Sequence, residues 1–339
     1  MRRTRVAPLL ALALLAGCGE DPVPTPPPEP PPPEEVDEGH AARPPDPPPG
    51  TLVRLTGTVT VGGAEATASM ELEAETPIDV PDAGQAVVQL RDGGRIELDG
   101  PARAILLEDG AAQAILVRGR LYAAQPPAGN APRPPLRIAS PTATVEIGQS
   151  GEIYLAAFPW GGSWVAVLEG AAAVSVGEAD TRRRLRDVEL DAGRAVAVPD
   201  RIAEPTEGPS RLAAAREAAA ALAAIETPAV EESAEHAVLA TEADRLDQAL
   251  RWLETEAGRG RDLTNQHRDA VRQGQQEEAT RLQRELVAHS QALYRLRRLA
   301  TARWERLRAR QLRLVELGRA PTEDPVAARQ DRVDGLLGQ

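Results

Sequence analysis

The spacing of apolar residues changes once along this chain, near residue 200, and that change limits the folds open to it. From Thr51 to Asp200, apolar and β-branched residues alternate in short runs such as "LVRLTGTVTV", "AVVQLRDGGRIEL" and "WVAVLEGAAAVSV". Turn-forming pairs such as Asp92-Gly93 and Glu169-Gly170 separate the runs. Short alternating runs between glycine turns are typical of antiparallel strands. The sequence therefore predicts an all-β unit over residues 51–200.

The spacing becomes helical after residues 201–209, which we interpret as a linker. Ser210 is placed to cap a first helix of strong helix formers, and Pro228 is expected to end it. Residues 210–318 as a whole are expected to form a helical bundle or coiled coil, either an antiparallel hairpin or three helices.

Two longer helices are predicted in that region, from Val230 to Glu256 and from Leu263 to Leu317. "GRGRD" at 258–262 is expected to be the turn between them, and residues 319–339 a frayed polar tail. Apolar residues separated alternately by four and three positions predict a coiled-coil seam. The seam consists of Leu239, Ala243, Leu246, Leu250, Leu253, Ala257, Leu282, Leu286, His289, Leu293, Leu296, Ala300, Arg303, Leu307, Arg310, Leu314 and Leu317.

Arginines are concentrated on the last predicted helix, and two interpretations stay open for them. They could dock acidic partners or lipid phosphates. They could equally form the outer face of a coiled coil and pair with glutamates of neighbouring helices. The residues concerned are Arg295, Arg297, Arg298, Arg306, Arg308 and Arg313.

The N-terminus carries the pattern of an export signal. Three arginines precede a short apolar run from Val6 to Leu15, which is too short to span a bilayer of ~30 Å. Leu15-Ala16-Gly17-Cys18 resembles the lipobox of bacterial lipoproteins. The resemblance implies cleavage between Gly17 and Cys18 and lipid attachment at Cys18, the only cysteine of the chain. A plain signal peptide over residues 1–17 is the alternative.

Residues 18–50 are dominated by proline and acidic residues and are predicted to be a disordered spacer with polyproline II character. Such a spacer would hold the folded part away from a membrane, whereas a proline-rich recognition ligand is the alternative function. Gly19 follows the cysteine, and in lipoproteins a residue other than Asp there implies transfer to the outer membrane. We therefore expect an exported protein anchored to that membrane through Cys18, on its periplasmic or its surface face.

The charge of the chain excludes one class of partner. The net charge is −12, and it becomes −15 when residues 1–17 are removed with their three arginines. A chain this acidic is not expected to bind nucleic acid in general. Aromatic residues make up only 2% of the sequence, so the core must be built from Val, Leu, Ile and Ala.

Several sequence segments of the β region, in a fixed order, resemble the FecR domain of exported bacterial proteins. They are "GTVTV" at 57–61, "VVQLRDGGRIELDGPARAIL" at 87–106, "VRGRLY" at 117–122, "SPTATVEIG" at 140–148, "VAVLEGAAAVSV" at 165–176 and "LDAGRAVAV" at 190–198. The chain departs from the family at "GQSGEIYL", where Ser150 and Ile153 stand nearest to a Gly-Thr-x-Phe-like turn.

The resemblance implies a compact β structure, solenoid-like or two-sheeted, that serves protein contact or sensing rather than catalysis. In the protein that gives the family its name, this domain follows a cytoplasmic anti-sigma region and a transmembrane helix. We find neither in this sequence, so direct control of a sigma factor is not expected.

The segment "PWGGSW" at 159–164 places two tryptophans beside Phe158 in an aromatic-poor chain. Phe158, Trp160 and Trp164 could stack on a sugar or a peptide, which makes them a candidate binding corner. The other interpretation is a hairpin corner whose rings cap the end of the β core.

Motifs for catalysis or metal binding are not found. The histidines at 40, 236, 267 and 289 form no metal-binding pattern, and there is no phosphate-binding loop or nucleophile elbow. We therefore expect no enzyme activity, no cofactor and no metal. The sequence predicts a non-enzymatic envelope lipoprotein whose β domain contacts a protein partner and whose helices assemble or self-associate. The alternative is a sensor that couples an envelope ligand or receptor to a signalling partner.

Overall fold

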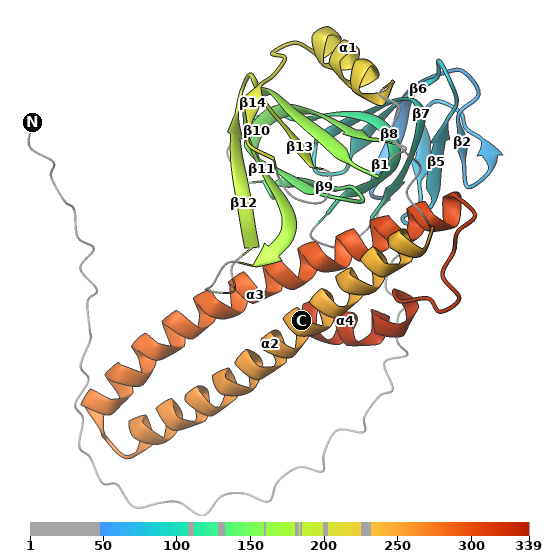
Figure 1. Cartoon of the computed structure of the whole chain (residues 1–339). Helices are drawn as coiled ribbons and strands as arrows, with labels where there is room; N and C mark the ends of the chain where they lie inside the picture. The colour runs from blue at the N-terminus through green and yellow to red at the C-terminus, as the bar shows by residue number, and fades with distance from the viewer. Residues whose placement is uncertain are drawn as a thin grey trace, which may run out of the picture. The chain divides into compact units, whose positions relative to one another are not determined.

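The computed structural model describes residues 48–107, 112–127, 133–158, 161–179, 183, 185–198, 203–224 and 232–338, which all belong to one unit. A mixed β-sheet is followed by a long helical region, as the sequence predicts (Figure 1). The lipobox, Cys18 and the proline-rich spacer lie outside the described residues.

The strands span residues 50 to 207. They are β1 (Gly50–Thr56), β2 (Thr60–Val61), β3 (Ala64–Glu65), β4 (Met70–Leu72), β5 (Pro77–Val80), β6 (Gln85–Leu90), β7 (Arg95–Leu106), β8 (Ala114–Gln125), β9 (Leu136–Ala139), β10 (Thr144–Ala157), β11 (Ser163–Ala179), β12 (Leu185–Asp191), β13 (Arg194–Val198) and β14 (Thr206–Glu207). The helices are α1 (Leu212–Ala223), α2 (Glu232–Arg272), α3 (Gln276–Glu316) and α4 (Gln330–Leu337), with a 3₁₀ turn, η1 (Ala327–Arg329), before α4.

All these strands belong to one connected sheet that folds over on itself. The long strands β7, β8, β10 and β11 each change partner along their length. The first part of β7 pairs with β6 and its last part with β5, while β11 pairs first with β13 and then with β12. Each long strand therefore runs through two layers that face each other. The parallel pair β8–β9 makes the sheet mixed.

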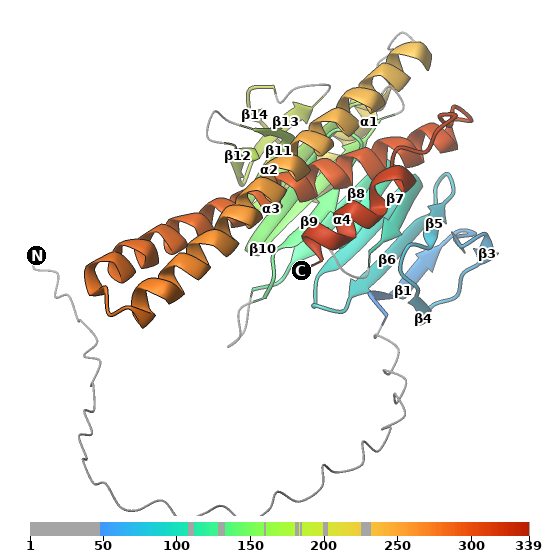
Figure 2. The same ribbon diagram turned by 90° about the horizontal axis from the view of Figure 1, so that it is seen from below.

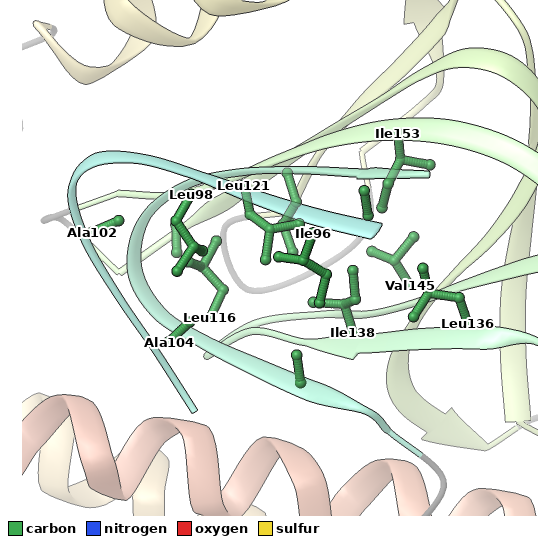
Figure 3. Packing of buried hydrophobic residues seen from close by; sticks show 14 of the residues in the cluster. Ile96, Leu98, Ala102, Ala104, Leu116, Leu121, Leu136, Ile138, Val145 and Ile153 are labelled. Carbon is green, nitrogen blue, oxygen red and sulfur yellow. The ribbon is translucent and has the colours of Figure 1, made fainter. Parts of the chain in front are cut away.

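The main core lies between these layers (Figure 3). Because successive side chains of a strand point to opposite faces, every second residue of the long strands enters the core. In Figure 3, Leu98, Leu121 and Ile153 lie on one side and Leu116 and Val145 on the other, although Leu121 and Leu116 belong to the same strand. The alternating apolar residues of each long strand thus contribute to the core from both layers.

Glycines allow the long strands to pass between layers. Gly119 in β8 has a φ of +96°, and a Cβ atom there would lie 2.5 Å from Cα of Ala102 in β7. Gly170 in β11 has a φ of +72°, and its Cβ atom would lie 2.7 Å from the carbonyl oxygen of Ser150. Only glycine combines this backbone conformation with so close an approach.

Helices cover the outer faces of both layers. The alanine-rich α1 packs on the face that carries Tyr122, Tyr154, Phe158 and Trp164. On the other face, Ala309 of α3 joins a cluster with residues of β7, β8 and β9. The helix α2 runs antiparallel to α3, and α4 packs against both (Figures 1 and 2).

The turn between the long helices lies elsewhere than the sequence predicts. "GRGRD" at 258–262 is helical, and the chain reverses at Gln273–Gln275, where Gly274 has a φ of +68°. Gly260 serves close packing, because a Cβ atom there would lie 2.9 Å from Cε1 of His289 on α3. Gly260 therefore allows α2 and α3 to pack closely and does not end a helix.

Other local predictions also differ from the structure. The predicted linker contains β14, which pairs with β13. The N-cap of α1 is Arg211 rather than Ser210, and no side chain caps the helix. Pro228 lies outside the described residues. The predicted frayed tail contains α4, which is held because Val333 packs against α2 and α3 and because Arg329 donates to both carboxylate oxygens of Asp247.

Candidate functional site

A cavity of about 490 Å³ opens where β7 and β8 pass from one layer to the other. The strands contribute its floor, with Phe158 at the end of β10, and helices from both faces contribute its walls. The helix α1 presents Ala220 and Ala223, one turn apart, on one wall, and the C-terminal end of α3 forms the other wall. The lining residues are Pro101, Arg118, Gly119, Arg120, Ala157, Phe158, Ala220, Ala223, Arg313, Glu316 and Leu317.

The polar groups of this cavity are three arginines and one carboxylate. Arg118 forms an ion pair with Glu316 of α3. Arg120 donates a hydrogen bond from Nη2 to the carbonyl oxygen of Gly100, at 2.5 Å. Arg313 is buried, and burial lowers its pKa although Glu235 and Glu316 raise it. The cavity is therefore mostly apolar with an excess of positive charge.

Two rings of the aromatic corner predicted from the sequence are buried in one cluster. Phe158 and Trp164 both pack beneath α1 with Tyr154. Phe158 also lines the cavity. Trp160 lies outside the described residues. A stacking site built from all three rings stays a prediction.

The helix α1 is fastened to the sheet by one arginine. Arg216 donates from Nε to Oδ2 of Asp99 at 2.7 Å and from Nη2 to Oδ1 of Asp99 at 2.9 Å, and it also pairs with Glu97. The hydrogen bond to Asp99 raises the pKa of Arg216. The hydroxyl of Tyr154 donates to the same carboxylate at 3.0 Å, and burial raises the pKa of that hydroxyl. These polar groups orient α1 over the aromatic residues.

Three arginines of the arginine-rich face of α3 form ion pairs inside the molecule. Arg306 pairs with Glu242 of α2 at 2.8 Å, as one of the two interpretations of the sequence had it. Arg298 instead pairs with Glu146 of β10 at 3.1 Å, and Arg308 pairs with Glu75 at 2.8 Å. The β region thus supplies carboxylates, one from a strand and one from a turn, for arginines that the sequence offered to an external partner.

Carboxylates gather where α3 crosses the sheet. Glu305 is buried, accepts a hydrogen bond from Thr144 at 3.3 Å and lies 3.6 Å from Nη2 of Arg137. Burial raises the pKa of Glu305, and it also raises the pKa of nearby Asp187. These two carboxyl groups therefore bind protons at a higher pH than exposed carboxyl groups do.

The α2–α3 hairpin has two unlike halves. We define the docked half as residues 232–254 with 295–316, and the distal half as residues 255–294. The side chains of α3 that bond to the sheet lie between Arg298 and Glu316. Both views show the remaining part extending beyond the sheet (Figures 1 and 2).

The distal half buries a narrow seam. Its side-chain core consists of Leu263, Ala270, Ala279 and Leu282, with Leu286 partly buried. Nearer the sheet, Nδ1 of His289 lies 2.9 Å from Oε1 of Glu256. Val287 and Tyr294 are seven residues apart on α3 and are 57% and 65% exposed. The outer surface of this half is available for contact.

Neither a metal centre nor a membrane span is found in the described ranges. No group of three or more potential metal ligands occurs among those residues. Over the same part of the chain, no helix combines the length and the apolarity needed to cross a bilayer.

Comparison with known proteins adds little. No family model and no curated protein matches the chain. Two crystal structures described as "a putative anti-sigma factor from Parabacteroides distasonis ATCC 8503" are similar at 15% and 14% identity, each with a TM-score of 0.32 over 40% of this chain. The chain spans 60% of the length of the protein it matches. A TM-score this low carries no argument, so the function is argued from the geometry of this chain.

The cavity is the feature that sequence reasoning missed. Arg118 and Arg120 lie in "VRGRLY", whose pattern predicts only a strand. Two arginines flanking a glycine in an otherwise apolar strand are a weak signal for a charged group at a bend. Glu316 and Arg313 could not be connected with them, because almost 200 residues separate these elements.

Proposed function

We propose that this chain is a non-enzymatic lipoprotein of the bacterial envelope that assembles through the distal half of its helical hairpin. The observation that carries the proposal is that the chain covers the sheet with its own helices but leaves the distal half of the hairpin uncovered. Both outer faces of the sheet are covered by helices of the chain itself, whereas the distal half extends beyond the sheet. The β domain and the docked half then act as the support that holds this half in place.

A second copy of the chain is the partner that the charges favour. The distal half contains six arginines and six acidic residues, so its formal net charge is zero. The whole chain has a net charge of −12, so two copies repel each other elsewhere. Contact between two neutral, mixed-charge hairpins avoids that repulsion. Val287 and Tyr294, at the same position of successive heptads, provide apolar contacts for it.

Cysteine crosslinking tests this contact in intact cells. Once Cys18 is lipidated, the chain has no other thiol, so Val287→Cys introduces a single reactive site. Val315→Cys is the matched control, since Val315 is an exposed valine of the same helix in the docked half. We expect a disulfide or bismaleimide-linked dimer for Val287→Cys, visible on a non-reducing gel, and none for Val315→Cys. Equal crosslinking of the two variants, or none, contradicts the proposal.

The lipid anchor is a separate part of the proposal. A thioether-linked diacylglycerol with an additional N-terminal acyl chain provides several apolar chains, which anchor stably where one chain is marginal. Mass spectrometry of the mature N-terminus is expected to show these groups on Cys18. Cys18→Ala is expected to stay uncleaved or to leave the outer-membrane fraction. An unmodified Cys18 at the N-terminus of a membrane-bound protein contradicts this part alone.

The cavity between α1, the sheet and α3 favours a second candidate function. A ligand bound there would contact both α1 and α3, one of the two helices of the hairpin. The protein would then be an envelope sensor whose assembly responds to a ligand. A dimer fraction that changes with ligand in the Val287→Cys assay distinguishes the sensor from a constitutive assembly protein.

A further inference from the structure

The cavity at the bends of β7 and β8 has the composition of a ligand site. Its volume of about 490 Å³ falls within the range of small-molecule pockets, which is roughly 300–1,000 Å³. Phe158, Ala157 and Pro101 provide apolar surface from the strands, and Leu317 provides it from α3. An occupant therefore needs an apolar body.

The α1 wall leaves the space open. Ala220 and Ala223 are the residues of α1 that face the cavity, and both are exposed. A larger side chain at either position would occupy the space that the methyl groups leave. The cavity thus depends on two small residues of one helix turn, which makes it possible to close it by substitution.

The charges of the cavity favour an anion. Arg118, Arg120 and Arg313 face a single carboxylate, that of Glu316. Arg118 is already paired with Glu316, which leaves Arg120 as the guanidinium best placed to meet a ligand. Within the described part of the chain, Arg120 makes one hydrogen bond, to Gly100, whereas a guanidinium has five N–H donors. A half-buried guanidinium beside an apolar cavity can bind a carboxylate strongly, because such charge-assisted bonds are stronger than neutral ones.

We infer that this cavity binds a medium-chain acyl carboxylate, with its alkyl chain against Phe158 and the alanines of α1 and its carboxylate on Arg120. This inference deepens the sensor candidate by naming a ligand class. It holds whether or not the distal half of the hairpin self-associates, so the two proposals fail independently.

Calorimetric titration of the full mature chain tests the inference. The chain carries Cys18→Ser, so that no acyl group of its own competes for the site. Dodecanoate is the probe, dodecanol is the same chain without the charge, and acetate is the charge without the chain. We expect dodecanoate to bind with a stoichiometry of one. The affinity should rise from octanoate to dodecanoate by up to roughly fourfold per methylene group, whereas acetate should not bind measurably.

Matched substitutions locate the binding. Ala220→Trp fills the cavity and is expected to abolish binding, whereas Ala221→Trp places the same ring at an exposed neighbour outside the cavity and should leave it intact. Arg120→Gln should weaken dodecanoate at least tenfold, roughly the value of a hydrogen bond to a charged group, without weakening dodecanol. Arg95→Gln makes the same charge change away from the cavity and is its control.

The outcomes separate clearly. Loss of binding in Ala220→Trp but not in Ala221→Trp, together with selective weakening by Arg120→Gln, establishes the site. Ala223→Trp repeats the test if Ala220→Trp does not fold. Absence of binding to the unsubstituted cavity, equal affinity for dodecanoate and dodecanol, or equal effects of the two tryptophans overturns the inference.

Discussion

The docked and distal halves of the α2–α3 hairpin belong to the same two helices but are stabilised in different ways. The docked half packs a continuous apolar cluster with α4 and also buries charged residues, among them Arg303, Glu305 and Arg306. The distal half has a seam of a few residues and a mostly polar surface that also exposes Val287 and Tyr294. One pair of helices therefore contains a part that is fixed by tertiary contacts and a part that depends on its own seam.

The difference shows how a charged helix face can become an interior. Arg303 donates from Nε to the carbonyl oxygen of Gly177 at 2.8 Å and also to the carbonyl oxygen of Arg245 on α2. A third element is thus joined to two helices through one side chain. The distal half lacks such a third element, and most of the stability of a helix in a protein comes from the packing of its apolar face, which here is a narrow seam. We expect the docked half to unfold with the sheet and the distal half to open locally.

The largest effect is expected at the buried ion pair of the docked half. The side chains of Arg306 and Glu242 are 1% and 3% exposed. Arg306→Ala leaves the buried Glu242 carboxylate paired with the partly exposed Arg245 of the same helix, which should lower the free energy of unfolding by up to about 3–5 kcal/mol. Urea unfolding followed by tryptophan fluorescence measures it, because Trp252 and Trp304 both lie in the docked half.

Two companion variants control this prediction. Arg281→Ala removes an exposed pair with Glu278 in the distal half and should leave the unfolding midpoint unchanged. Replacing both Arg306 and Glu242 by leucine should recover most of the loss, because no buried charge then remains unpaired. A double variant as unstable as Arg306→Ala would show that the site needs its charges.

Matched leucine truncations should separate the halves next. Leu246 and Leu282 are both almost fully buried, one in each half. Leu246→Ala should cost about 2–5 kcal/mol in the same urea experiment. Leu282→Ala should change that transition by less than about 1 kcal/mol, because the distal half can open while the rest stays folded. Equal losses would mean that the hairpin unfolds as one cooperative unit, and the contrast between its halves would be wrong.

Substitutions of two glycines of α2 should change the stability of the distal half by smaller amounts. Gly258→Ala places a Cβ atom in ordinary contact with Nη2 of Arg261, at 3.9 Å, and should stabilise the distal half by roughly 0.5–1 kcal/mol, since glycine is a weak helix former. Gly260→Ala should destabilise it, because the new atom would crowd the ring of His289. Hydrogen exchange of the backbone amides in the distal half measures both effects. Adding His289→Ala to Gly260→Ala should restore protection, and failure to do so would place the crowding elsewhere.

The smallest effect is a change in the pH dependence of stability. Burial holds the pKa of Glu305 above its ordinary 4.5, despite Arg137 and Arg308, and Glu146 raises it further. The folded state therefore binds more protons than the unfolded state above pH 4.5, so this group adds stability as the pH falls through its folded pKa.

Glu305→Gln should remove that part of the slope. Between pH 7 and pH 5 the variant should gain less stability than the unsubstituted protein. Urea midpoints at a series of pH values measure the difference. A steeper gain in Glu305→Gln would reverse the assigned direction. Glu278→Gln, at an exposed pair of the distal half, is the control and should leave the slope above pH 5 unchanged.

Much of the fold follows from local pattern. The alternation of apolar residues predicts the strands, and the seam residues Leu246, Leu250 and Leu307 are fully buried as expected. The sequence predicts the turn at 258–262, with Gly258 ending the helix, because glycines of that segment look like Gly274 in sequence. In the structure Gly258 is helical, Gly260 packs against His289, and Gly274 has the positive φ of the turn. The arginines of α3 are equally ambiguous in sequence, because their partners are distant along the chain: Glu75 lies in the turn before β5 and Glu146 on β10.

The sequence by itself determined where strands and helices form, because periodicity and turn residues act over a few neighbouring positions. Only the tertiary structure decided which arginines are buried, which half of the hairpin is supported, and that a cavity exists at the strand bends. Arg118 and Glu316 illustrate the reason, since 198 residues separate them along the chain and they meet only when α3 packs on the sheet. Contacts of that kind depend on the mutual placement of complete elements, which no local pattern encodes.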